Sequence, residues 1–215
     1  MNPLWTELCA RAGIELSTDA AGKLEAYLDL LLSVNEQMNL TRITDRPAAE
    51  VLHIGDSLTL LAFLPPGKLR LADIGAGGGL PGVPIAIVRP EIAVTLIDAT
   101  QKKAAFLQRV AEALKLENVR VIAARSEQLR GHQYDVVVAR ALAAMDQLVK
   151  WCLPLVRPGG KLLAMKGPRG REELATAAQS IRRYRGQPAL VHDAGLPGRD
   201  HIVIEISRRG PPPAC

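Results

Sequence analysis

The sequence predicts an α/β protein built on a doubly wound, mostly parallel sheet. Strand-like apolar runs alternate with helical patterns from residue 68 onward, which is typical of successive βαβ units. A turn with four glycines in five residues, 75–79, follows the first of these runs. Such a turn between a parallel strand and a helix is a usual binding place for a nucleotide-like ligand.

The N-terminal part of the chain predicts a helical extension that packs on this α/β domain. Ser17 or Thr18 can cap a helix with an apolar stripe along one side. A second helix is expected from about Pro47 to Leu64. The chain is therefore divided into the extension, 1–64, the α/β domain, 65–209, and a tail expected to be disordered, 210–215.

Nine elements are expected in the main part of the α/β domain. The predicted strands lie at 69–74, 92–97, 119–123, 134–139 and 160–165, and the predicted helices at 81–89, 101–115, 144–156 and 170–184. The tail of the domain differs, because 188–190 and 201–206 flank a glycine-proline turn at 195–198. These two runs predict a hairpin that closes the sheet with an antiparallel last strand.

Length and composition predict one medium-sized cytoplasmic domain. A chain of 215 residues with 48% hydrophobic residues can bury a full core. Its three cysteines, Cys9, Cys152 and Cys215, show no pairing or ligand spacing, which fits a reducing compartment. We expect no secretion signal, because the chain does not open with a basic and then apolar run, and no membrane segment, because no apolar stretch is long enough. We also expect no metal, because the four histidines lack ligand spacing.

Charge is distributed unevenly along the chain. Residues 1–60 hold 4 Lys and Arg against 9 Asp and Glu, a net charge of −5, whereas residues 61–215 hold 23 against 13, a net charge of +10. A strongly basic domain favours a polyanionic partner such as nucleic acid. Aromatic residues make up only 3% of the chain, which argues against a single-strand binder built on stacking platforms.

The glycine turn fits two cofactor patterns. Gly77-x-Gly79-x-x-Gly82 matches the dinucleotide fingerprint, but Gly82 then falls inside the helix start, an awkward place for a packing glycine. Asp73-x-Gly75-x-Gly77-x-Gly79 is instead the pattern of class I S-adenosylmethionine (AdoMet) methyltransferases. AdoMet needs close backbone approach and a carboxylate near its cationic end, a role for Asp73 directly or through water. The antiparallel last strand also favours AdoMet.

A second acid supports a cofactor that carries ribose. Asp98 ends the next strand, 19 residues after Gly79, where a carboxylate would accept hydrogen bonds from ribose hydroxyls. This position does not distinguish AdoMet from NAD. Asp98 can also cap the helix that begins near Gln101, and the two roles are compatible.

Several motifs resemble those of the bacterial small-subunit ribosomal RNA methyltransferase G family, also called glucose-inhibited division protein B. The resemblance extends from about residue 24 to 206. The matching motifs are Asn35-x-x-x-Asn39-Leu40-Thr41, His53-Ile54-Gly55-Asp56-Ser57-Leu58, the glycine turn with its Leu80-Pro81-Gly82 ending, Asp98-Ala99-x-x-Lys102-Lys103, Arg125-x-Glu127, Ala139-Arg140-Ala141 and Lys166-Gly167. Two positions depart from the family pattern: Val34 replaces the usual Trp, and Leu52 replaces a basic residue that is one possible RNA contact.

The resemblance implies a Rossmann-like class I methyltransferase fold and AdoMet-dependent methylation of guanine N7 in 16S ribosomal RNA. Its substrate would be this RNA or the small ribosomal subunit, and the enzyme would act as a monomer. Guanine N7 carries no proton, so no general base and no catalytic side chain are expected. A methyltransferase for a small molecule or protein is the alternative, and an NAD-dependent oxidoreductase ranks behind both.

Site residues are assigned by combining the resemblance with the expected strand ends. The predicted AdoMet-binding residues are Gly75, Ala76, Gly77, Gly79, Leu80, Asp98, Ser126, Glu127 and Arg140. Arg140 is expected to clamp a carboxylate, either of the methionine part or of a protein acid. The predicted RNA-binding residues are Lys102, Lys103, Lys166 and His53. His53 and Asp56 are also expected to hydrogen bond to each other on one helical face.

Overall fold

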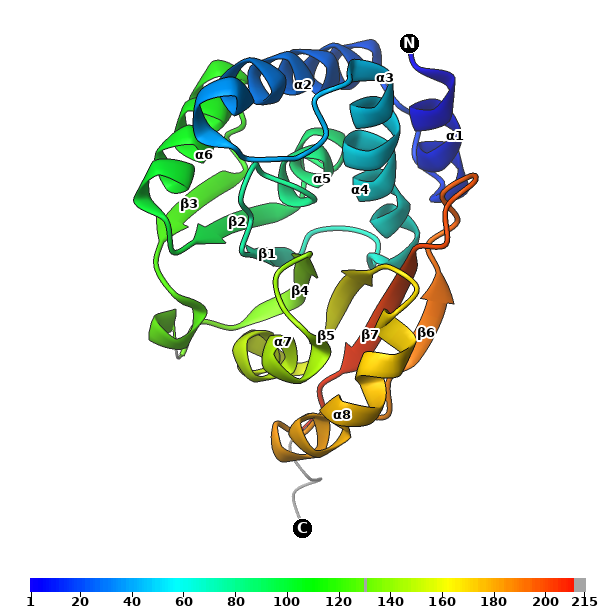
Figure 1. The fold of residues 1–215 in the computed structure, drawn as a ribbon, viewed down its shortest axis with the longest axis vertical. Helices are drawn as coiled ribbons and strands as arrows, with labels where there is room; N and C mark the ends of the chain where they lie inside the picture. Colours follow the sequence, from blue (N-terminus) through cyan, green and yellow to red (C-terminus); the bar gives the residue numbers. More distant parts are fainter. Residues whose placement is uncertain (130, 211–215) are drawn as a thin grey trace.

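The computed structural model describes residues 1–129 and 131–210, and its centre is a seven-stranded sheet in the order β3-β2-β1-β4-β5-β7-β6 (Figure 1). The strands are β1 (Arg70–Ile74), β2 (Ala93–Asp98), β3 (Val119–Ala123), β4 (Tyr134–Arg140), β5 (Val156–Lys166), β6 (Leu190–Asp193) and β7 (Ile202–Ser207). Strands β1 to β5 pair in parallel, whereas β7 is antiparallel to both β5 and β6. The predicted fold class and the closing hairpin are confirmed.

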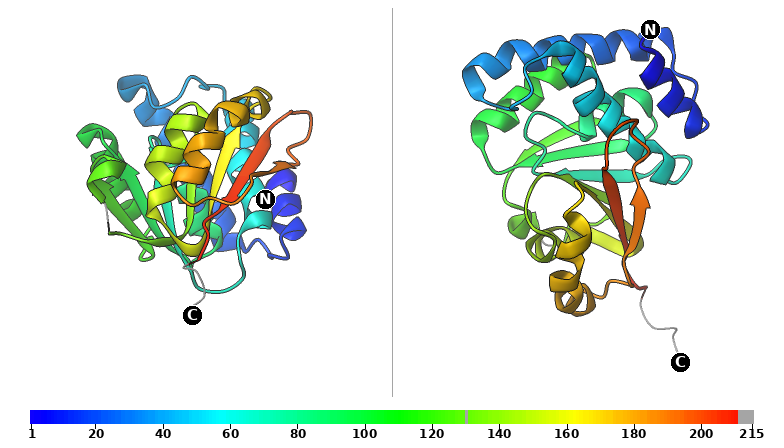
Figure 2. Two further views of the ribbon diagram at one scale, coloured as in Figure 1. Left: turned by 90° about the horizontal axis from the view of Figure 1, so that it is seen from below. Right: turned by 45° about the vertical axis from the view of Figure 1, so that its right-hand side comes forward.

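Helices cover both faces of the sheet (Figure 2). They are α1 (Pro3–Arg11), α2 (Thr18–Met38), α3 (Arg46–Ala49), α4 (Asp56–Leu58), α5 (Gly82–Val88), α6 (Gln101–Ala113), α7 (Met145–Cys152) and α8 (Gly170–Arg183). One apolar core joins the N-terminal helices, α5 and α6 to one face, and a second joins α7 and α8 to the other. The division follows the alternation of side chains along each strand.

Two expected boundaries differ from the structure for identifiable reasons. The helix predicted at 144–156 ends at Cys152 and continues only as a 3-10 turn, Leu153–Leu155. Pro154 lacks the N–H that an α-helix needs at this point, so the helix ends early. Strand β5 then begins at Val156, four residues before the predicted start. The predicted tail, apart from Gly210, lies outside the described residues.

Helix α1 was missed by the sequence analysis, although its start signal is present. The Asn2 side chain caps the helix by accepting hydrogen bonds from the amides of Leu4 and Trp5, and Pro3 occupies the first turn. Fully buried Trp5 donates its indole N–H to the Glu50 carbonyl at 3.0 Å. This bond fixes α1 against the second helical segment of the extension.

That second segment is one continuous helical run, but its hydrogen-bond pattern changes along the way. Asp45 caps it by accepting from the Ala48 amide at 2.8 Å, two residues before the predicted start at Pro47. The run passes from α3 through a π-helical turn, Glu50–Gly55, to α4 and a 3-10 turn, Thr59–Phe63. Helix α2 has the predicted cap, because the Ser17 hydroxyl accepts from the Ala20 amide.

The extension also holds the glycine turn in place. The hydroxyl of fully buried Tyr27, on α2, donates to the Gly78 carbonyl at 2.7 Å. A Cβ on Gly78 would lie 2.8 Å from Leu31 Cδ1, so α2 packs directly on the backbone of the turn. Residues far apart in the sequence therefore form one unit around the predicted cofactor site.

Candidate active site

The glycine turn connects β1 to α5 through left-handed backbone. Gly75, Gly77 and Gly79 have φ values of 71°, 57° and 102°, which glycine adopts without a Cβ penalty. The space beside the turn is also tight, since a Cβ on Gly75 would lie 2.4 Å from Leu142 Cδ1. Gly82 is a packing glycine after all, because its Cβ would lie 2.3 Å from Leu96 Cδ2. The sequence argument against that role was wrong.

Asp73, on β1, lies beneath the glycine turn in the protein interior and supports it with a hydrogen bond. Its side chain is fully buried, and its Oδ2 accepts the Gly82 amide at 2.8 Å. Burial raises the pKa of this carboxyl to about 7. Asp73 thus holds the start of α5, and its Oδ1 has no hydrogen-bond partner among the described residues. Its expected role near the cationic end of AdoMet, directly or through water, stays a prediction.

Asp98, at the end of β2, lies where the sequence places it. Its Oδ2 accepts from the Gly77 amide at 2.9 Å, and its Oδ1 accepts from the Thr100 amide at 2.8 Å, just before α6. Each carboxylate oxygen keeps a second lone pair. The same carboxylate can therefore order the glycine turn, support the start of α6 and accept from a ribose.

A cavity of about 470 Å³ lies beside Asp98. Residues at or just after the carboxyl ends of β1, β2, β3 and β4 line it. We call it the adenosine cavity. Ser126 and Glu127 line it together with Trp151, which the sequence analysis did not select. The Ser126 hydroxyl donates to Glu127 Oε2 at 2.9 Å, and Glu127 remains exposed. A slot that combines apolar side chains with the carboxylates of Asp98 and Glu127 fits an adenosine group.

A second cavity, of about 720 Å³, lies between the glycine turn and residues 39–44. We call it the methionine cavity. Gly75, Ala76, Gly77 and Leu80 line it, whereas Gly79 does not. Three cations, Arg42, Lys103 and Arg140, and the acid Glu36 also line it, which suits an amino acid carboxylate and ammonium group. The residues present therefore fit AdoMet across the two cavities.

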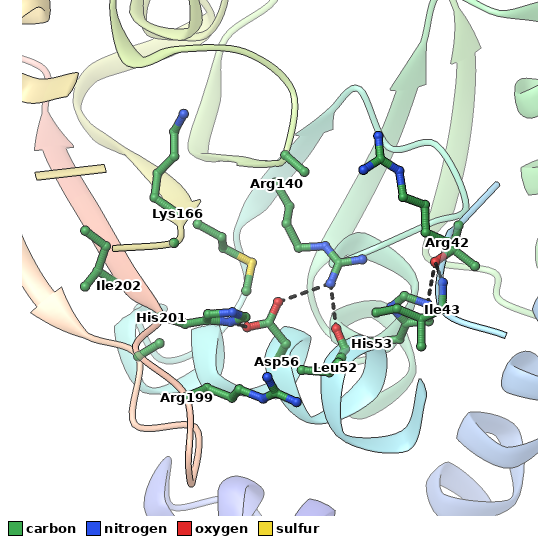
Figure 3. A pocket seen from close by; sticks show the side chains of 15 residues that line it. Arg42, Ile43, Leu52, His53, Asp56, Arg140, Lys166, Arg199, His201 and Ile202 are labelled. Atoms are coloured by element: carbon green, nitrogen blue, oxygen red, sulfur yellow. Dashed lines mark hydrogen bonds and ion pairs between the residues drawn. The ribbon is translucent and has the colours of Figure 1, made fainter. Parts of the chain in front are cut away.

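Arg140 clamps a protein acid, one of the two outcomes expected for it. Its guanidinium donates to Asp56 Oδ2 at 3.1 Å and to the Leu52 carbonyl at 2.9 Å (Figure 3). Asp56 Oδ1 pairs with His201 Nδ1 at 2.8 Å, and this contact with Asp56 raises the pKa of His201. Asp56 thus joins the end of β4, the residue before β7 and the extension at one buried point.

The predicted hydrogen bond between His53 and Asp56 is wrong. His53 Nε2 instead lies 2.9 Å from Thr41 Oγ1, and its Nδ1 has no partner among the described residues. The ring is 3% exposed. Burial, together with the nearby Arg140 charge, lowers the pKa of His53 to about 4. At neutral pH the imidazole is therefore uncharged.

A third cavity, of about 450 Å³, adjoins Arg140 on the side of β5 and β7 (Figure 3). We call it the basic cavity. Its cationic lining residues are Arg42, Arg140, Lys166 and Arg199, and its histidines are His53 and His201. Arg42, Arg199 and His201 were not selected from the sequence. No spacing rule joins His201 to Asp56, because 145 residues separate them.

The predicted RNA-binding lysines occupy different environments. Lys103 lines the adenosine and methionine cavities, whereas exposed Lys102 lines none of the three. Lys166 Nζ is held by Glu173 Oε2 at 2.7 Å and by the Ala143 carbonyl at 2.5 Å, and its side chain is 9% exposed. Its positive charge is therefore already compensated. The RNA contacts of these lysines and of buried His53 stay predictions.

Within the described parts of the chain, 1–129 and 131–210, no group of three or more potential ligands could hold a metal ion. No helix among these residues is long and apolar enough to cross a membrane.

The fold and the site together define a class I AdoMet-dependent methyltransferase. Solved structures share the fold at low identity. The ribosomal protein L11 methylase of Lactobacillus delbrueckii subsp. bulgaricus is 16% identical with a TM-score of 0.56, over 74% of this chain and 79% of that one. An rRNA methylase from Streptococcus thermophilus is 14% identical with a TM-score of 0.52, over 78% and 99%.

The chain belongs to the rRNA small subunit methyltransferase G family, whose model matches residues 20–203. Two relatives are named ribosomal RNA small subunit methyltransferase G. The one from Sorangium cellulosum is 45% identical, over 96% of this chain and 88% of its own length. The one from Neisseria meningitidis serogroup B is 40% identical, over 93% and 95%. The family resemblance found in the sequence is confirmed.

Proposed function

We propose that this protein transfers the methyl group of AdoMet to N7 of one guanine in 16S ribosomal RNA. The observation that carries the proposal is the meeting of the three cavities at Ala141, which lines all of them. The adenosine and methionine cavities fit the cofactor, and the basic cavity opens from the same point toward an anionic substrate. Family membership supports ribosomal RNA as that substrate.

The reaction needs little from the protein beyond positioning. When bound, AdoMet supplies a sulfonium methyl group: the N7 lone pair forms the new N–C bond as the S–C bond breaks, leaving S-adenosylhomocysteine and a cationic purine. N7 carries no proton, so no side chain has to act as a base. Rate enhancement then comes from approach, alignment and the electrostatic environment.

This chain's own residues would divide that task. Asp98 would bind the ribose, and the glycine turn would wrap the methionine part. Ser126 and Glu127 would meet the adenine edge. Arg140 lines both the methionine and the basic cavities, so it would face cofactor and substrate at once. Its hydrogen bonds to Asp56 and the Leu52 carbonyl would keep that side chain in a fixed orientation.

The test is transfer of radiolabelled methyl from AdoMet to small ribosomal subunits that lack this modification. Separation of RNA from protein afterwards gives three outcomes. Label in the RNA supports the proposal, and label in a ribosomal protein supports the protein-methyltransferase alternative. No label, with AdoMet binding demonstrated by calorimetry, leaves a small-molecule substrate. A cytoplasmic location and a monomeric state also remain predictions, which cell fractionation and light scattering would test.

A further inference from the structure

The basic cavity carries positive charge that no acid compensates. Asp56 is its only acidic lining residue, and both oxygens of that carboxylate are paired. Arg140 is paired with Asp56, and Lys166 with Glu173. Neither Arg42 nor Arg199 forms an ion pair with an acid in the described parts of the chain.

These two arginines are exposed and come from different elements. Arg42 lies in the segment between α2 and α3, and Arg199 lies in the turn between β6 and β7. Figure 3 shows their guanidinium groups well apart, one on each side of the Arg140–Asp56 pair. Two separated, uncompensated guanidinium groups suit successive phosphates of a nucleic acid chain better than one compact anion.

The wall between the two arginines is mostly apolar. Ile43, Leu52, Met165, Ala194 and Ile202 contribute to it. A volume of about 450 Å³ lies within the range of roughly 300–1,000 Å³ typical of small-ligand sites. Apolar surface beside cationic groups is the chemistry that a purine nucleotide requires.

The basic cavity also adjoins the methionine cavity. It shares Thr41, Arg42, Arg140 and Ala141 with the methionine cavity. A base seated in it would therefore meet the methionine end of the cofactor at Ala141. Enzymes that modify a stacked base must draw it out of the stack to reach the reacting atom.

We propose that the basic cavity binds the target guanosine as a nucleotide drawn out of the RNA stack, with its flanking phosphates on Arg42 and Arg199. The base lies against the apolar wall, with its N7 edge directed toward Ala141. This assignment rests on the proposed function, because it names the place in the protein where the RNA substrate meets the cofactor. Lys166, already paired, holds the loop beside the cavity and leaves phosphate binding to the two arginines.

The first experiment compares R42Q and R199Q with a matched control, R183Q, in methyl transfer to unmethylated small ribosomal subunits. Arg183 is exposed, ends α8 and lines none of the three cavities. We expect each cavity variant to lower kcat/KM by ~10-fold or more through KM, with AdoMet affinity unchanged. In a plot of the logarithm of the RNA-binding constant against the logarithm of salt concentration, each cavity variant should have a slope smaller in magnitude by about one than the parent. R183Q should match the parent.

The second experiment does not require activity. Guanosine 5′-monophosphate is titrated into the protein saturated with S-adenosylhomocysteine, and the imidazole proton signals of His201 are followed by nuclear magnetic resonance. We expect these signals to shift in the parent and in R183Q, and to shift less in R199Q. Inorganic phosphate alone should produce a smaller change than the nucleotide.

The outcomes separate this proposal from the proposed function. Active parent protein whose R42Q and R199Q variants behave like R183Q would overturn the nucleotide site and leave the function standing. Parent protein that methylates no RNA but whose His201 signals respond to the nucleotide would overturn the function and retain the site. Unshifted His201 signals at millimolar nucleotide would contradict the site whatever the activity.

Discussion

At the scale of single residues, Ala141 lies where the adenosine, methionine and basic cavities meet. Its φ of 50° is left-handed, and its small side chain leaves the three cavities connected. A141V would add branched carbons at this point and strain the backbone further. We expect at least a ~100-fold loss of kcat/KM, because misplacement by about an ångström has effects of that size. A141G, measured beside it by unfolding and kinetics, should retain stability within ~1 kcal/mol.

Asp98 gives a test of the cofactor assignment. D98A removes the carboxylate at the floor of the adenosine cavity and leaves the Gly77 amide without its partner. Losing charge-assisted hydrogen bonds of about 1.5–3 kcal/mol should weaken AdoMet binding by ~10- to 100-fold in calorimetry. E117A, at an exposed acid just before the amino end of β3, is the control. Unchanged affinity in D98A would remove Asp98 from the ribose site.

His53 predicts a pH dependence of stability with a defined sign. Its pKa is about 4 in the folded protein and about 6.5 in the unfolded chain. Between these two pH values only the unfolded chain binds a proton at His53. The contribution of neutral His53 to the unfolding free energy is therefore fully present above pH 6.5 and is lost as pH falls toward 4. Between pH 6.5 and pH 4 the unfolding free energy of the parent should therefore fall by up to ~3 kcal/mol more than that of H53Q.

Urea unfolding of both proteins at pH 7.5 and pH 5 measures this difference, of which about 2 kcal/mol should be present at pH 5. Comparing the two proteins at each pH cancels groups they share, including His201, whose raised pKa acts in the opposite direction. H132Q, at an exposed histidine, should keep the parent's pH dependence. Parallel pH dependence in the parent and H53Q would show that His53 titrates normally.

At the scale of elements, the N-terminal extension acts on the cofactor site through α2. Y27F removes the hydrogen bond to the Gly78 carbonyl and leaves that buried acceptor without its partner. We expect a loss of ~1–3 kcal/mol in unfolding free energy, together with weaker AdoMet binding. Y184F, at a half-buried tyrosine after α8, should change neither. Weaker folding with unchanged AdoMet affinity would limit α2 to a purely structural role.

The elements also show what a sequence can and cannot predict. Apolar runs placed the five parallel strands to within about four residues, because parallel strands buried on both faces are recognisable locally. The first hairpin strand was predicted at 188–190 but lies at Leu190–Asp193. Ser17 and Asp98 were found for the same reason, since caps and strand ends are local features. The partners of Asp56 were not predicted, because Arg140 and His201 reach it only through the tertiary fold. The π-helical turn between α3 and α4 likewise has no local signal that we used.

At the scale of the whole molecule, the uneven charge has a structural counterpart. The extension compensates some of its acids internally, since Arg46 pairs with Glu25, Asp29 and Glu50. Two arginines without an acidic partner among the described residues, Arg42 and Arg199, lie at the basic cavity, beside the cofactor site. These two cations therefore lie where an RNA substrate would have to meet the cofactor.

The central claim is that cofactor and guanine meet at Ala141 and that N7 is the methyl acceptor. The most direct measurement maps the labelled nucleotide after reaction with unmethylated small ribosomal subunits. N7-methylguanine is distinguished from other methylated bases by chain cleavage after borohydride reduction and aniline treatment. We predict one site, at a guanine, with cleavage that requires the enzyme and AdoMet. Label on a different atom or base, or on ribosomal protein, would contradict the account.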